Sequence, residues 1–277
     1  MFDTDTRKGR ARHMHMIETN GVRLHVADDG PRDGFPVVFS NSLGTDLRLW
    51  DQMLPLLPDG LRLIRYDKRG HGLSDCPLAP YHMGDLVKDA AGVMETFGVN
   101  NALFVGLSIG GIIAQGLAAE RPDLVRAIVL ADTAAKIGTL QMWADRVTAV
   151  RAGGIEALEA ATMERWFSKD FLKNRQIDLA AWRHMLCRTP AEGYVGCSQA
   201  ISETDLIEST SRLSLPTLAI VGYQDGATPP DLVRETANLI PGSRFEIIQG
   251  AGHLPCVEHP KEMARLITNF MEDNNLG

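Results

Sequence analysis

One short run of this 277-residue chain has the composition of a catalytic turn. Residues 106–110 read GLSIG, a G-x-S-x-G pattern that follows an apolar run and opens a helical one. Small residues flank the serine in such a strand-to-helix turn because the backbones come too close for a Cβ atom. The turn would lift the Ser108 hydroxyl out at the carboxyl end of a sheet, above the positive end of a helix. The sequence therefore predicts that Ser108 is a nucleophile, with a merely structural glycine-rich turn as the alternative.

A serine nucleophile needs a base and an orienting acid, and two later loops supply both. Asp225 closes one predicted strand, and His253 follows the last one in a glycine-rich turn. We favour these two residues because they occur in the hydrolase order of serine, acid and histidine, and one crossover unit links them. Asp132, after an earlier strand, is the rival acid. His71, in a glycine-bounded turn before the serine, is the rival base.

Acyl transfer also requires N–H donors for the oxyanion that forms on the substrate carbonyl. The amide after the nucleophile, that of Ile109, is expected to be the first donor. The second is expected from the small polar loop at residues 40–45, SNSLGT, and we assign it to Leu43. An ordinary turn, in which Asn41 and Ser42 bond their own backbone, is the alternative.

The elements that must position these groups alternate between short apolar runs and amphipathic stretches. This alternation is typical of an α/β fold with a mostly parallel sheet and crossover helices. A hairpin around Asn20-Gly21 predicts an antiparallel start to the sheet. Six further strands are predicted at residues 37–40, 62–66, 102–105, 127–130, 217–221 and 244–248.

The strand signals stop between residues 133 and 212, where apolar residues recur at helical spacing. Helices are predicted there at residues 140–151, 154–166 and 179–186. We expect residues 133–212 to form a helical cap, or lid, inserted into a hydrolase core made of residues 17–132 and 213–277. Residues 1–16 have no apolar run and are predicted to be a flexible leader or a tag remnant.

Composition and charge exclude several classes of protein. The chain is 44% hydrophobic and 23% charged, close to a globular average, so disordered and collagen-like classes are excluded. Lys and Arg number 28 against 35 Asp and Glu, and the net charge of −7 argues against nucleic acid or anionic membrane as a partner. The four cysteines show no metal-ligand spacing, so we expect no metal and a reduced, cytoplasmic setting.

These motifs together resemble the α/β-hydrolase superfamily over about residues 17–270. The resemblance rests on the serine turn at residues 106–110, which we call the elbow, and on the order of serine, acid and histidine. It rests also on the YDKRGHGLS segment at residues 66–74. More narrowly, FSNSLGTD at residues 39–46 and GYQDGATPP at residues 222–230 resemble the 3-oxoadipate enol-lactonases of the β-ketoadipate pathway. Residues 252–260 depart from that pattern and read like a more general hydrolase ending.

The narrower resemblance implies a cofactor-free serine hydrolase of aromatic-compound catabolism. It would open the ring of 3-oxoadipate enol-lactone and give 3-oxoadipate, with an enolate as the leaving group. Alternatives on the same scaffold are a carboxylesterase, a C–C hydrolase of meta-cleavage products and a perhydrolase. A ligand receptor without turnover is the alternative from another class.

A substrate with a free carboxylate requires a cation in an acidic protein. The implied partner is a small lactone or ester that bears a carboxylate, and a homo-oligomer is compatible with the composition. Arginines in the cap are the candidate ligands, and Trp143 is a candidate pocket wall. The candidate cations are Arg146, Arg183 and Arg188, together with Arg151 and Lys136.

Overall fold

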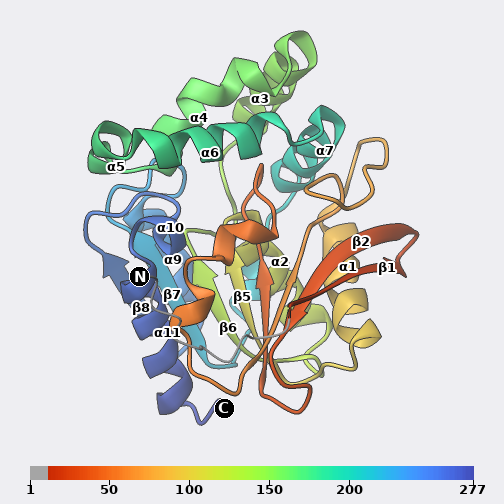
Figure 1. Ribbon diagram of the computed structural model, residues 1–277, viewed down its shortest axis with the longest axis vertical. Helices are drawn as coiled ribbons and strands as arrows, with labels where there is room; N and C mark the ends of the chain where they lie inside the picture. The colour runs from red at the N-terminus through yellow and green to blue at the C-terminus, as the bar shows by residue number, and fades with distance from the viewer. Residues whose placement is uncertain (1–11) are drawn as a thin grey trace, which may run out of the picture.

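The protein is built on an eight-stranded sheet with the strand order β1-β2-β4-β3-β5-β6-β7-β8. A computed structural model describes residues 12–277 (Figure 1). Strand β2 pairs antiparallel with β1 and β4, and the other pairings are parallel. The mostly parallel eight-stranded sheet predicted from the sequence is thereby confirmed. The strands are β1 (Arg12–Thr19), β2 (Val22–Asp29), β3 (Pro36–Ser40), β4 (Arg62–Tyr66), β5 (Ala102–Leu107), β6 (Val125–Ala131), β7 (Thr217–Gly222) and β8 (Arg244–Ile248).

The hairpin that opens the sheet begins earlier than the sequence predicted. Its turn lies at Asn20-Gly21, where both residues have positive φ, 47° and 72°, as a two-residue hairpin turn requires. Strand β1 starts at Arg12 and pairs with β2 along its whole length, so the prediction of a leader is wrong for residues 12–16. Backbone pairing, rather than an apolar run, places these residues in the sheet, and Met14 is 63% exposed. Residues 1–11 lie outside the described part of the chain.

The central strands are buried on both faces because helices pack on either side of the sheet. Helix α1 contacts α2, α2 contacts the short helix α8 (Ile207–Thr210) at the end of the cap segment, and α8 contacts α9, whereas α11 packs against the short helix η2. The flanking helices are α1 (Met83–Thr96), α2 (Ile109–Glu120), α9 (Pro230–Leu239) and α11 (Pro260–Asp273), with the short elements η1 (Leu47–Trp50), η2 (Leu54–Leu56) and α10 (Pro255–Glu258).

The chain between β6 and β7 contains helices and no strand. We call residues 133–212 the cap, and Figure 1 shows its helices α3 to α7 stacked over one end of the sheet. Trp166, Phe167 and Leu186 extend the hydrophobic core of the sheet into the cap. No helix within residues 12–277 is long and apolar enough to cross a membrane. The cap helices are α3 (Leu140–Gly153), η3 (Ile155–Leu158), α4 (Glu159–Trp166), α5 (Lys169–Asn174), α6 (Gln176–Cys187), α7 (Ala191–Ser202) and α8 (Ile207–Thr210).

Candidate active site

Ser108 occupies a tight turn between β5 and α2. Its φ of 58° and ψ of −119° fall in a region that residues other than glycine rarely adopt. Two glycines make the turn possible. A Cβ atom on Gly106 would lie 2.1 Å from the carbonyl oxygen of Gly110, and one on Gly110 would lie 2.0 Å from that of Ser40. The turn therefore holds the Ser108 side chain at the N-terminus of α2, as the G-x-S-x-G pattern predicts.

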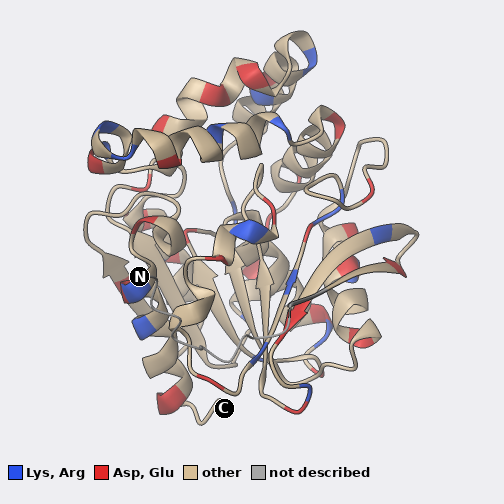
Figure 2. Cartoon of the chain, viewed as in Figure 1, with Lys and Arg blue, Asp and Glu red and all other residues tan. Residues whose placement is uncertain are grey.

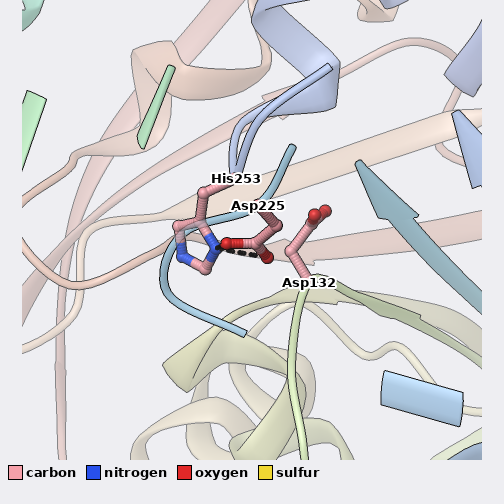
Figure 3. Close-up of side chains that lie close together, drawn as sticks. All are labelled: Asp132, Asp225 and His253. Atoms are coloured by element: carbon pink, nitrogen blue, oxygen red, sulfur yellow. Dashed lines mark hydrogen bonds and ion pairs between the residues drawn. The ribbon is translucent and has the colours of Figure 1, made fainter. Parts of the chain in front are cut away.

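Asp225 and His253 meet at the same edge of the sheet, because they follow the adjacent parallel strands β7 and β8. The Nδ1 atom of His253 lies 2.9 Å from Oδ2 and 3.0 Å from Oδ1 of Asp225 (Figure 3). The carboxylate also accepts hydrogen bonds from the amides of Ala227 and Thr228, at 2.7 and 3.0 Å, and from the Thr228 hydroxyl at 2.7 Å. These bonds fix the carboxylate, and the carboxylate fixes the imidazole ring.

The charge state of Asp225 follows from its contacts. Burial alone would raise the pKa of this carboxyl, but the charge and hydrogen bond of His253 and the hydrogen bond from Thr228 outweigh burial. The pKa of Asp225 therefore lies below its ordinary value, and the group is ionised at neutral pH. An ionised carboxylate on Nδ1 is what a histidine base requires for its orientation and for stabilisation of its charged form.

Asp132, the rival acid, lies next to this pair without bonding to the histidine. Figure 3 shows Asp225 between His253 and Asp132. The Oδ1 atom of Asp132 accepts the amide hydrogen of Gly222 at 2.9 Å. Burial raises the pKa of Asp132 well above its ordinary value, and the negative charge of Asp225 raises it further. The structure therefore favours Asp225 as the orienting acid, with Asp132 behind it as a carboxyl whose ionised form is disfavoured.

Among residues 14–277, the same three side chains, Asp132, Asp225 and His253, form the one group whose spacing could hold a metal ion. Their potential ligand atoms lie within 4.8 Å of one another. A metal would have to displace the hydrogen bond between His253 and Asp225, and the raised pKa of Asp132 opposes the ionised form that a metal ligand needs. The donor set fits a hydrogen-bonded acid and base better than a metal centre.

Two backbone amides beside Ser108 are free to bind an oxyanion. The N–H groups of Leu43 and Ile109 have no hydrogen-bond acceptor among residues 12–277. Leu43 lines the same cavity as Ser108. The rival base, His71, is buried in the support of this loop, where its Nε2 accepts the amide hydrogen of Gly44 at 3.0 Å. That bond occupies the nitrogen that a base would need.

A cavity of about 100 Å³ lies between the elbow and the cap, and Ser108 and His253 both line it. Trp143 and Arg146 lie at this cavity, where the sequence places a pocket wall and a cation. The indole N–H of Trp143 donates to the carbonyl oxygen of Ile137 at 2.7 Å, and the Arg146 guanidinium lies 4.6 Å from the centroid of the indole. The cap side of the cavity is lined by Ile137, Met142, Trp143, Arg146, Thr162, Arg165, Trp166, Tyr194 and Ile201.

Arg165 is a second cation in this cavity, and it was missed in the sequence. Hydrogen bonds tie the end of α4 to the catalytic loops: the amide of Gly226 donates to the Arg165 carbonyl oxygen at 3.2 Å, and that of His253 to the Trp166 carbonyl oxygen at 2.8 Å. Burial lowers the pKa of the half-buried Arg165, and repulsion from Arg146 lowers it further. The signal that could have revealed Arg165 is its place beside Trp166, on the apolar side of its helix.

Neither arginine forms an ion pair with a carboxylate within residues 12–277, whereas Arg151 and Arg183 each do. Charges of both signs lie along the cap helices (Figure 2). Arg183 is 44% exposed at its side chain and pairs with Glu159 at 2.7 Å, while Arg188 lines a separate cavity of about 470 Å³. Neither Arg183 nor Arg188 is among the residues that line the cavity of Ser108, so the structure does not bring these two predicted ligands to the serine. Lys136 pairs with Asp205 and Arg151 with Glu192.

Comparison with known proteins places this geometry in context. The family described as alpha/beta hydrolase fold matches residues 36–260. The curated proteins 3-oxoadipate enol-lactonase 2 and 3-oxoadipate enol-lactonase 1 of Acinetobacter baylyi are each 34% identical to the chain, over 94% of this chain and 97% of each relative. A non-heme chloroperoxidase of Streptomyces lividans is 28% identical, over 88% of this chain and 94% of that protein.

Solved structures agree with the sequence comparison. The crystal structure of the enol-lactonase from Burkholderia xenovorans LB400 superposes with a TM-score of 0.90 at 35% identity, over 93% of this chain and 100% of that one. A thermophilic esterase from Thermogutta terrifontis superposes with a TM-score of 0.86 at 27% identity, over 96% of this chain and 98% of that one. The resemblance stated from the sequence motifs is thereby confirmed.

Proposed function

The chain belongs to the α/β-hydrolase fold family, and from that premise we propose that it is a serine hydrolase that opens 3-oxoadipate enol-lactone to 3-oxoadipate. One observation carries the proposal. A single cavity is lined by Ser108, by the imidazole of His253 and by two arginines that form no ion pair with a carboxylate within residues 12–277. The first pair suits acyl transfer, and the arginines suit a substrate that carries a carboxylate. The relatives named as 3-oxoadipate enol-lactonases support the choice of substrate.

The reaction divides into two acyl transfers through the same groups. His253 takes the proton of the Ser108 hydroxyl while the serine oxygen attacks the lactone carbonyl carbon. The amides of Leu43 and Ile109 bind the oxyanion. Collapse of the tetrahedral intermediate breaks the ring C–O bond, and the enolate oxygen leaves, takes the proton from His253 and ketonises. Asp225 stabilises the charged imidazole throughout, and no cofactor takes part.

Hydrolysis of the acyl-enzyme completes the cycle. His253 now removes a proton from water, whose oxygen attacks the ester carbonyl carbon of the acyl-serine. The same two amides bind the second oxyanion. The bond to the serine oxygen breaks, Ser108 regains its proton from His253, and 3-oxoadipate is released.

The arginine pair gives this proposal its specificity. A guanidinium binds a carboxylate through two parallel charge-assisted hydrogen bonds, and such bonds strengthen where water is excluded. Arg146 and Arg165 both face the cavity, and their mutual repulsion is relieved when an anion lies between them. An apolar cap would favour simple esters, so the pair favours the lactone over a general carboxylesterase, a C–C hydrolase or a perhydrolase. A receptor without turnover would not need the serine, acid and histidine together.

The setting of the reaction is part of the same proposal. All four cysteines are free, which supports a reduced, cytoplasmic compartment. Residues 133–212 would act as the lid over the substrate, and residues 17–132 and 213–277 as the catalytic core. The partner is then a small carboxylate-bearing lactone, and neither nucleic acid nor membrane is needed.

Steady-state hydrolysis of two substrates tests the function. We expect wild-type protein to hydrolyse the enol-lactone with a higher kcat/KM than p-nitrophenyl acetate, which has no carboxylate. Ser108→Ala is expected to abolish turnover of both. Equal or lower kcat/KM for the lactone would refute the substrate, and full activity of Ser108→Ala would refute the mechanism.

A further inference from the structure

Lys68 is a buried lysine behind the loop that contains Leu43. The residue lies two positions after the end of β4 and is 1% exposed. The Nζ atom donates to the carbonyl oxygen of Ser42 at 2.9 Å and to that of Asn41 at 3.2 Å. Within residues 12–277, Lys68 forms no ion pair with a carboxylate, although a buried ammonium without one costs stability. The fold therefore keeps a costly charge directed at two backbone carbonyls.

Those two bonds set the direction of the Leu43 amide. The peptide between Ser42 and Leu43 is trans, since the one cis peptide among the described residues joins Ala79 and Pro80. In a trans peptide the C=O and the N–H point in opposite directions. Because Lys68 holds the Ser42 oxygen from behind, the Leu43 N–H points away from the lysine, toward the cavity that Leu43 lines with the nucleophile.

The preceding peptide is held in the same way. The Asn41 oxygen also faces Lys68, so the Ser42 N–H is turned to the same side as that of Leu43. Neither N–H has an acceptor in the described part of the chain. Successive N–H groups directed to one side form a concavity that binds anions. The loop is thus arranged around a negative charge that forms during the reaction.

Other contacts of this loop are between neutral groups. The Thr45 hydroxyl donates to the Ser42 oxygen at 2.9 Å, and the Trp50 indole N–H donates to the Asn41 side-chain oxygen at 2.9 Å. His71 accepts from the loop as well, and burial together with the charge of Lys68 lowers its pKa well below the ordinary value, so the ring is neutral. Lys68 is therefore the cation that polarises the loop from behind.

We propose that Lys68 is a positioning residue for the oxyanion hole: its ammonium orients the Ser42–Leu43 peptide and polarises it, so that the Leu43 N–H becomes a stronger donor as charge forms on the substrate carbonyl oxygen. This assignment rests on the proposed serine-hydrolase function. The lysine touches no reacting atom and acts through the peptide alone. Its effect belongs to the transition state, so it changes kcat rather than KM.

The protonation of Lys68 gives the proposal a pH signature. Burial lowers the pKa of Lys68 from 10.5 to about 8, and the acidic groups that face it, Cys197 on α7, Asp67 beside it and Asp46 before η1, raise it in part. Burial raises the pKa of the Cys197 thiol to about 12, so that group is neutral at pH 8. His71, the other facing titratable group, is neutral across this range. Loss of the ammonium above about pH 8 therefore lowers kcat on the alkaline side.

Kinetics of three variants with p-nitrophenyl acetate test this assignment without reliance on the lactone. Lys68→Met is expected to lower kcat about 10- to 100-fold, which is no more than the effect of removing a whole oxyanion donor. Its KM should stay within about threefold of the wild-type KM. It should also remove the alkaline fall near pH 8. Lys68→Arg, which stays charged, is expected to restore most of the rate and to move the alkaline fall to higher pH. Lys88→Met, at an exposed lysine of α1, is the matched control with wild-type kinetics.

Binding of phenylboronic acid adds a readout that a merely structural role would not change selectively. The boronate takes a tetrahedral form on the serine, and one of its oxygens occupies the oxyanion hole. Its inhibition constant should rise in Lys68→Met by the factor that kcat falls, while the KM of the ester stays the same. Circular dichroism melting of each variant checks that the protein is folded at the assay temperature.

Several results would overturn the assignment. A folded Lys68→Met with wild-type kcat would do so, as would an unchanged alkaline limb. If Lys68→Met does not fold, Lys68→Arg decides instead. An alkaline fall in the kcat of Lys68→Arg that stays near pH 8 would then overturn the assignment. An inactive Ser108→Ala together with a fully active Lys68→Met would refute this inference alone, whereas an active Ser108→Ala would refute the proposed function as well.

Discussion

Asp225 and Asp132 are neighbouring buried acids. Substitution of each in turn by asparagine separates their roles with minimal change in shape. Asp225 is ionised and accepts the Nδ1 hydrogen of His253, as well as hydrogen bonds from Ala227 and Thr228. Asparagine would present N–H donors to Nδ1 and favour the wrong tautomer of the imidazole. The known cost of that change in serine triads is about 10⁴-fold in kcat, or about 5 kcal/mol. We expect a loss of this size in Asp225→Asn.

Asp132→Asn should behave differently, because burial and the charge of Asp225 already raise the pKa of Asp132 and disfavour its ionised form in the folded protein. An amide keeps the acceptor for the Gly222 N–H, and it also keeps a donor that can face Asp225. The kcat is therefore expected to fall by less than about threefold, and the ratio of the two losses to exceed about 10³. Steady-state rates with p-nitrophenyl acetate at pH 7.5 measure both losses.

The stability of Asp132→Asn gives a second measurement. The unfolded chain ionises Asp132 near its ordinary pKa, whereas the folded protein keeps the proton to higher pH. Between those two pKa values the folded state binds more protons, so the free energy of unfolding of the wild type falls as pH rises. Asparagine removes this dependence, and the melting temperature of Asp132→Asn relative to wild type should be higher at pH 7.5 than at pH 4. A larger loss of kcat in Asp132→Asn than in Asp225→Asn would refute the assignment of the acid.

Four further substitutions test the cavity and the packing around it. Arg146→Gln and Arg165→Gln should each raise the KM for the enol-lactone about 10-fold or more, since a charge-assisted hydrogen bond contributes about 1.5–3 kcal/mol; the KM for p-nitrophenyl acetate should stay the same, and Arg183→Gln is the control with an unchanged KM for both substrates. Gly110→Ala places a Cβ atom 2.0 Å from the Ser40 carbonyl oxygen, so kcat should fall at least about 10-fold. Urea unfolding should show that the free energy of unfolding falls by about 1–3 kcal/mol. An unaltered kcat would contradict the tight turn at Ser108. Gly193→Ala places a Cβ atom 2.1 Å from the Gly70 carbonyl oxygen, so the melting temperature should drop by several degrees; Gly84→Ala, with no atom within 4 Å, is its control.

The elbow and the strands were predictable because the signals that define them are local. Glycines at Gly106 and Gly110 are required by contacts that any strand-to-helix turn of this kind makes, so the pattern alone reveals the turn. The central strands are buried on both faces and therefore appear as unbroken apolar runs. The strand order then brings Asp225 and His253 to one edge, as their positions after neighbouring strands predict.

The features that were missed depend on partners far away in the sequence. Helix α7 contains two glycines that lower its helix propensity, and it forms because Gly193 packs on Gly70 and Gly196 on the Tyr81 ring. Arg165 enters the cavity because the end of α4 is bonded to the loops of Asp225 and His253. The glycine contacts of α7 leave no periodic signal within that helix. For the same reason, the sequence could not separate Arg146 from the cap cations that pair with neighbouring acids.

The charges around the cavity also explain how a substrate would be oriented in a protein with a net charge of −7. The ionised Asp225 lies behind His253, and the two arginines lie in the cap wall of the same cavity. A carboxylate is therefore attracted to the cap and repelled from the catalytic acid, and the two effects select one orientation. In that orientation the lactone carbonyl is the end left to face Ser108 and the Leu43 amide. Removal of both arginines would remove the attraction but leave the repulsion, so the double variant should lose the lactone as a substrate and keep its activity on p-nitrophenyl acetate.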